Sequence, residues 1–169
     1  MEKILLINGI SPYLYGLIIY LTPQDAQIRL DKVLLAAFLV QLLMTIILSL
    51  VSKDKAKLAK ITMINKLVQI PYYILFFVFA VAGVVFGMSL MGIGILFIPI
   101  FIAIDFGVFL TTLIPEEICT IKLKATGRIS TGRFILYLIG NVFYVVDIVL
   151  SVLINKEYRE ELSCHELHK

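Results

Sequence analysis

The sequence predicts an all-α integral membrane protein, a bundle of about five transmembrane helices forming one domain over residues 1–169. Its composition is 60% hydrophobic and 16% charged, with a mean hydropathy of +1.00, which is far more apolar than a soluble domain. The 49 residues from 67 to 115 contain one charged side chain, that of Asp105. Because a spanning helix needs about 20 apolar residues, this stretch alone predicts two spans.

The first two spans are expected at about residues 4–21 and 33–51. The first has only Lys3 ahead of it and no small-residue cleavage site, so we expect an uncleaved span and not a signal peptide. Thr22 and Pro23 predict a very short turn, because proline favours the first turn of a helix. Five lysines follow, and on a helical wheel they are distributed over all sides, so that no apolar stripe remains. They predict a solvated helical extension: Lys53, Lys55, Lys57, Lys60 and Lys66.

The third and fourth spans are expected at about residues 67–87 and 90–114, with Pro115 ending the fourth. The polar segment that follows contains Glu116 and Glu117 and is expected to be a solvated loop, with docking of a partner as the alternative. The fifth span is expected at about residues 134–154, followed by a charged tail.

Basic residues predict the orientation of these five spans. The N-terminus and residues 52–66 and 115–133 would share one side with ten Lys and Arg residues, which leaves five for the other side. The ten should face the cytoplasm, placing the N-terminus inside and the tail outside. The Ile- and Lys-rich composition is compatible with a bacterial plasma membrane. Because the basic residues are spread over several loops, the net charge of +3 does not indicate nucleic-acid binding.

Small and polar residues recur at helical spacing and predict packing seams. Ala80, Gly83 and Gly87 follow one another at steps of three and four on the third span, and Gly140 lies on a similar stripe of the fifth. Small residues let neighbouring helices approach closely where lipid offers no hydrophobic reason for association. Helix packing is therefore the simplest interpretation of these stripes.

Four polar residues could share one depth in the bundle. At 1.5 Å per residue, Gln41, Asp105, Tyr144 and Asp147 lie roughly 14–21 Å from the cytoplasmic ends of their spans. The expected spans contain no basic residue to pair with the two carboxylates, so these would be protonated, hydrated or bound to a cation. We therefore predict a proton or cation site at these four residues. The alternative is that each aspartate is neutral and hydrogen-bonded within the bundle.

No catalytic motif is present in the sequence, which lacks HExxH, GxSxG, CxxC and a glycine-rich phosphate loop. The residues around Asp105 and Asp147 match neither motif of intramembrane aspartyl proteases. The tail contains Cys164, His165 and His168, with Cys164 and His168 one turn apart. A fourth ligand is lacking, so we expect no metal and no cofactor.

The sequence thus predicts a non-enzymatic interaction or accessory subunit of the plasma membrane. Its expected partners are the lipid bilayer and either another membrane protein or a second copy, and no nucleic acid. The alternative is a small proton- or cation-linked transporter or permeation protein that uses Asp105 and Asp147.

Overall fold

The computed structural model describes residues 2–89 and 92–167, except for the side chains of residues 2, 24–29, 144–145 and 160–167. Every described element is a helix. In chain order these are η1 (Glu2–Leu6), α1 (Ile7–Leu21), α2 (Gln24–Val51), α3 (Lys55–Ser89), η2 (Ile93–Leu96), α4 (Phe97–Ala125), α5 (Thr131–Gly140) and α6 (Tyr144–Leu167).

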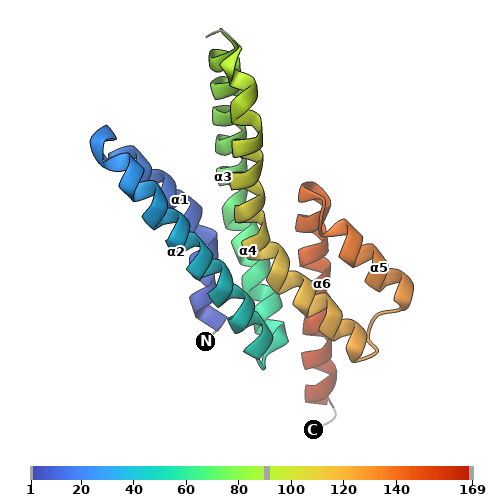
Figure 1. The fold of residues 1–169 in the computed structure, drawn as a ribbon. Coiled ribbons are helices and arrows are strands. Elements are labelled where there is room, and N and C mark those ends of the chain that lie inside the picture. The colour runs from blue at the N-terminus through green and yellow to red at the C-terminus, as the bar shows by residue number, and fades with distance from the viewer. Residues whose placement is uncertain (1, 90–91, 168–169) are drawn as a thin grey trace.

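Four helical segments in the described part of the chain are long and apolar enough to cross a membrane. They are Lys3–Leu21, Leu30–Val51, Lys55–Ser89 and Ile93–Ala125. Figure 1 shows α3 and α4 as a long antiparallel pair, with α1 and α2 forming a second pair that leans away from it. Most of the large apolar side chains on these helices are exposed, such as Phe77 and Phe79 at 69% and 71%. This arrangement is compatible with a multi-pass membrane protein.

The prediction that residues 134–154 form one spanning helix is wrong, because this stretch is divided between α5 and α6. The chain reverses between α5 and α6, so these two helices form a hairpin beside the lower half of the α3–α4 pair (Figure 1). Gly140 lies at the end of α5 beside this reversal, where a Cβ atom would lie 2.4 Å from Leu150 Cδ1 of α6. Hydropathy could not detect the break, because both arms of the hairpin are apolar next to it.

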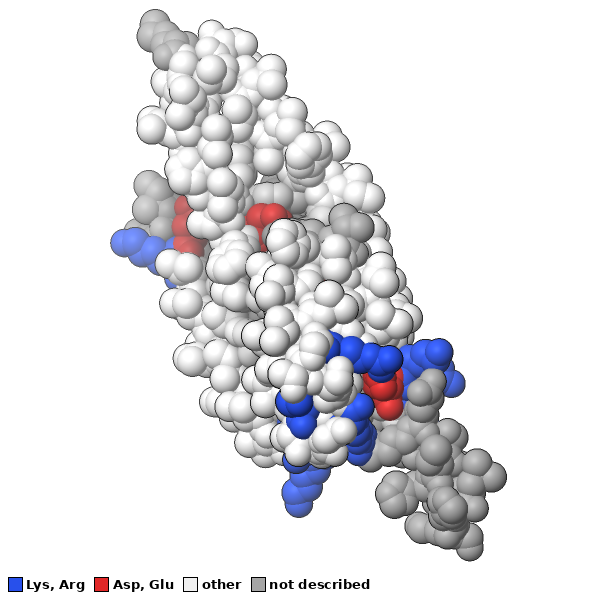
Figure 2. All heavy atoms as spheres, turned by 90° about the vertical axis from the view of Figure 1, so that its right-hand side faces the viewer, with Lys and Arg blue, Asp and Glu red and all other residues white. Residues whose placement is uncertain are grey.

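The hairpin also changes the expected position of the tail. Because α6 runs back beside α3, the last turn of α6 lies at the same end of the molecule as η1 and the α2–α3 and α4–α5 connections (Figure 1). The sequence-based topology had placed the tail at the opposite end. Figure 2 shows most of the visible Lys and Arg atoms gathered toward one end of the molecule.

The fourth helix does not end at Pro115. It continues to Ala125, with Pro115 inside it, because neighbouring groups can compensate for the backbone hydrogen bond that a proline removes from an apolar helix. The loop expected after residue 114 is therefore wrong, and both Glu116 and Glu117 are helical residues of α4.

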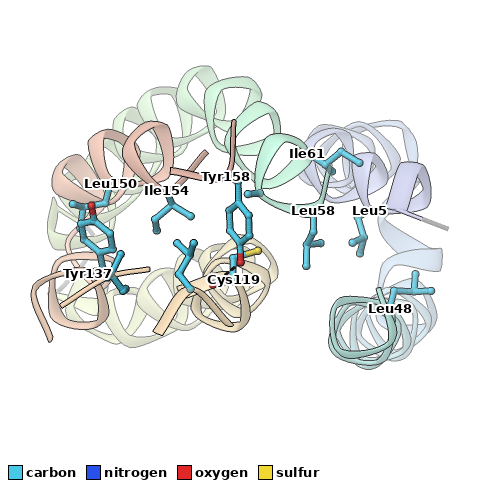
Figure 3. Close-up of a cluster of buried hydrophobic side chains, with 12 residues drawn as sticks. Leu5, Leu48, Leu58, Ile61, Cys119, Tyr137, Leu150, Ile154 and Tyr158 are labelled. Carbon is cyan, nitrogen blue, oxygen red and sulfur yellow. Dashed lines mark hydrogen bonds between the residues drawn. The ribbon is translucent and has the colours of Figure 1, made fainter. Parts of the chain in front are cut away.

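A buried apolar cluster joins the hairpin to the rest of the fold (Figure 3). Tyr158 of α6 points toward Cys119 of α4, and its hydroxyl donates a hydrogen bond to the Cys119 carbonyl oxygen at 2.9 Å. Tyr137 of α5 lies beside Leu150 of α6 within the hairpin. These contacts hold α6 in the position that brings its polar residues against α3 and α4.

Candidate functional site

A buried charge cluster occupies the junction of α3, α4 and α6. The Lys66 Nζ atom forms ion pairs with Glu116 Oε2 and Asp147 Oδ1. All three side chains are almost inaccessible, with relative exposures of 2–4%. Lys66 was expected in a solvated extension, and that expectation is wrong because the hairpin covers the face of α3 on which it lies. The expectation that Asp147 has no basic partner is wrong for the same reason.

Glu117 lies beside this cluster and contacts the turn of the hairpin. Its Oε1 atom accepts a hydrogen bond from Asn141 Nδ2 at 3.2 Å. Asn141 is fully buried. Glu117 Oε2 and Asn141 Oδ1 are both buried and have no hydrogen-bond partner in the described structure. The site therefore contains more acceptors than donors.

A separate hub of neutral polar groups joins the first four helices around Asn8. The Asn8 Nδ2 atom donates to Thr45 Oγ1 at 2.9 Å and to the Thr111 carbonyl at 3.3 Å, while Asn8 Oδ1 accepts from Gln41 Nε2 at 2.9 Å. The Asn8 carbonyl accepts from Gln69 Nε2 at 2.8 Å. Since buried amides are costly unless paired, this network fixes how the four helices associate.

Gln41 belongs to this hub and to no charged site. Its Nε2 also donates to Ser11 Oγ at 2.7 Å, and its Oε1 accepts from the Tyr15 hydroxyl at 2.6 Å. The amide of Gln41 is thereby satisfied by residues of α1, as expected for a group that holds helices together.

Asp105 lies elsewhere, in a groove on the outer face of α3 and α4. The groove has a volume of about 350 Å³ and is otherwise lined by Tyr73, Phe76, Phe77, Ala80, Phe101 and Ile102. The Asp105 charge also acts electrostatically on Tyr72. A second groove of about 280 Å³ shares four of those lining residues, namely Phe77, Ala80, Phe101 and Ile102, so the two are continuous along the helix pair.

The structure does not bring the predicted site residues together. Asp147 lies against Lys66 and Glu116, whereas Asp105 is 11 residues from Glu116 along α4, about 16 Å at 1.5 Å per residue. The side chain of Tyr144 lies outside the described part of the structure. A shared Asp105–Asp147 site is therefore not formed.

The glycines predicted to pack do lie at close helix contacts. A Cβ atom on Gly87 would lie 2.7 Å from the Gly94 Cα atom, and one on Gly83 would lie 3.3 Å from the Phe101 ring. Ala80 lines the Asp105 groove. The stripe on α3 thus faces η2 and α4, and Gly140 faces α6.

Lys66, Glu116 and Glu117 are the site residues that sequence reasoning missed. A signal was present, because Lys66 continues the stripe formed by Gln69 and Tyr73 at steps of three and four. Within the described residues, no group of three or more His, Cys, Asp or Glu side chains is arranged to hold a metal ion. The side chains of Cys164 and His168 lie outside that description.

Comparison with known proteins identifies no relative: no protein-family model, curated protein or solved structure matches the chain.

Proposed function

We propose that this chain is a non-enzymatic multi-pass membrane protein that serves as an interaction subunit of a larger membrane assembly. In this proposal α1–α4 cross the bilayer, and the α5–α6 hairpin enters and leaves on the side of the N-terminus. Of the 15 Lys and Arg residues, only Arg29 and Lys32 belong to the segment around the α1–α2 connection, and the α3–α4 connection has none. The positive-inside rule then places the N-terminus and the tail in the cytoplasm. A bacterial plasma membrane suits the composition.

Asp105 in the outer groove is the observation that carries this proposal. An ionisable residue within a membrane almost always faces a bundle interior or a water-filled cavity. Asp105 instead lines an apolar groove on the outside of the α3–α4 pair. A partner that covers the groove would remove the carboxylate from lipid.

The chemistry of the groove indicates a transmembrane helix with a basic residue as the partner. The apolar walls suit packing against a helix surface, and the carboxylate suits a Lys, Arg or His side chain at the same depth. A second copy of this chain supplies no such cation, because residues 67–115 contain no basic residue and Lys66 is buried against Glu116 and Asp147. The partner is therefore a different membrane protein.

Site-specific photo-crosslinking in the cells that make this protein tests the proposal. A photoreactive residue at Phe77 or Ile102, both in the groove, should form an adduct with one discrete protein. The same residue at Val40, which is 60% exposed on α2, should not. The crosslinked peptide of the partner should contain a basic residue within an apolar segment, and Asp105→Leu should reduce the adduct several-fold.

Two results would contradict the proposal. A groove adduct with twice the mass of this chain would show self-association, and equal labelling at Phe77 and Val40 without a protein adduct would show that lipid fills the groove.

A further inference from the structure

The buried charge cluster holds more negative than positive groups. Within the described structure, Lys66 is the ammonium that contacts it, while Glu116, Glu117 and Asp147 contribute three carboxyl groups. If all were ionised, the cluster would carry two uncompensated negative charges. Burial away from water makes such an excess costly, so the cluster favours the uptake of protons.

The ion pairs indicate which carboxyl groups stay ionised. Glu116 and Asp147 both contact the Lys66 ammonium directly, and an adjacent positive charge stabilises the charged form of a carboxyl group. Glu117 instead contacts the neutral amide of Asn141. Lys66 therefore stabilises the charged forms of Glu116 and Asp147 more directly than that of Glu117.

The unpaired atoms of Glu117 and Asn141 support the same assignment. Glu117 Oε1 accepts from Asn141 Nδ2 at 3.2 Å, whereas Glu117 Oε2 and Asn141 Oδ1 are buried without partners. Two acceptors cannot bond to each other, but a proton on Glu117 Oε2 would make that atom a donor, and Asn141 Oδ1 belongs to the same amide that Glu117 Oε1 already contacts. One proton would then satisfy both atoms and complete a carboxylic acid–amide pair with two hydrogen bonds.

We propose that Glu117 and Asn141 form a proton-binding site, in which neutral Glu117 fastens the turn of the α5–α6 hairpin to α4. A hydronium ion of the solvent supplies the proton: its O–H bond breaks, the Oε2–H bond of Glu117 forms, and a water molecule remains. The charged groups that face the site are Lys66 from α3, Glu116 from α4 and Asp147 from α6. When Glu117 loses its proton, the hydrogen bond to Asn141 Oδ1 is lost and a third negative charge joins the cluster, which weakens the attachment of the turn.

Glu117→Gln is the informative variant, because glutamine is close to an isostere of protonated glutamate and cannot ionise. Infrared spectra of the purified full chain in detergent at pH 7 should show a carboxylic acid C=O band that disappears in Glu117→Gln. As a control, Asp54→Asn, which changes a carboxylate outside the cluster, should leave this band in place. A spin-label distance between Val142 in the turn and Ile121 on α4 should widen at alkaline pH in the wild type and remain constant in Glu117→Gln.

The proposal fails if the infrared band is unchanged in Glu117→Gln, since Glu117 would then be ionised at pH 7. It also fails if the variant shows the wild-type pH dependence of the distance. Loss of folding in Glu117→Gln would equally contradict it, because the variant preserves both hydrogen bonds of the acid–amide pair. None of these results depends on a partner bound at the Asp105 groove.

Discussion

The Lys66 ammonium group of α3 forms a buried ion pair with the Asp147 carboxylate of α6, 81 positions later in the chain. Lys66 also contacts Glu116 of α4, so one side chain connects the hairpin to both long helices. Buried ion pairs contribute little compared with apolar packing, but removing one partner leaves an uncompensated charge. The pair therefore sets the position of α6 more than it stabilises the fold.

Replacing Lys66 by methionine should strongly destabilise the protein. The substitution leaves Glu116 and Asp147 buried without their cation, which costs on the order of 3–5 kcal/mol. Chemical unfolding in detergent measures the change. Lys60→Met on the exposed face of α3 is the matched control and should change stability by less than about 0.5 kcal/mol. Similar losses of stability in both variants would mean that the ion pairs of Lys66 do not account for its effect on stability.

Gly87→Ala should separate α3 from the start of the next helix. The added Cβ would lie 2.7 Å from the Gly94 Cα atom, a backbone atom that no side-chain rotation can move. We expect a loss of about 1–3 kcal/mol, as for other overpacked contacts. Gly16→Ala in α1 meets no atom within 4 Å and should be neutral or stabilising, because alanine favours the helix. Thermal unfolding measures the stability of both variants, and equal stabilities would contradict a close contact between Gly87 and Gly94.

Tyr13→Phe should weaken the middle of α3. Proline at position 71 lacks a backbone N–H group, and beside it the Tyr13 hydroxyl donates to the Val68 carbonyl at 2.6 Å and accepts from the Tyr72 N–H at 3.0 Å. Losing this bridge should cost about 1–3 kcal/mol and increase hydrogen exchange at the Tyr72 amide.

Tyr20→Phe is the control for that change, because Tyr20 is 85% exposed. If the Tyr72 amide exchanges at the same rate in Tyr13→Phe as in the wild type, the bridge does not protect the helix.

Asp54→Ala should remove a pH-dependent cap from α3. The Lys57 backbone N–H donates to Asp54 Oδ1 at 3.0 Å and holds the pKa of Asp54 below its usual value of 3.8. Because the folded-state pKa is lowered, the stabilisation is complete well above pH 3.8 and is lost as the pH falls through the folded-state value. We expect a difference of about 1 kcal/mol from the wild type at pH 7.

That difference should shrink as the pH falls below about 4. Asp54→Asn keeps a capping side chain without a titrating group, so its stability should not show this pH dependence. The interpretation would be abandoned if wild type and Asp54→Ala differed equally at pH 7 and pH 3.

The hairpin predicts that both termini lie on one side of the membrane. In a Cys119→Ser, Cys164→Ser background, single cysteines at Lys57, Lys124 and Arg159 should react with an impermeant reagent from the same side, and one at Lys32 from the other. Labelling of Arg159 from the side of Lys32 would restore a fifth crossing and rule out the hairpin as the protein's membrane topology.

The sequence by itself determined the class of fold and the seams that hold it. Composition and the 49 residues from 67 to 115 predicted long apolar helices, and the described residues form four that are long and apolar enough to cross a membrane. The spacing of Gly83 and Gly87 identified a packing face, and the structure places that face against Phe101 and Gly94. These are local properties, which a pattern of residue types can reveal.

Only the tertiary structure decided where the polar residues meet. Whether 134–154 is one span or a hairpin depends on how α5 and α6 pack against each other and against α4, and both alternatives have the same hydropathy. The hairpin then buries Lys66 and pairs it with Asp147, while Asp105 remains in an outer groove. A sequence pattern predicts that a charged residue at the end of an apolar segment is solvated. The burial of Lys66 could not be predicted in this way, because it depends on α6, whose Asp147 lies 81 positions later in the chain.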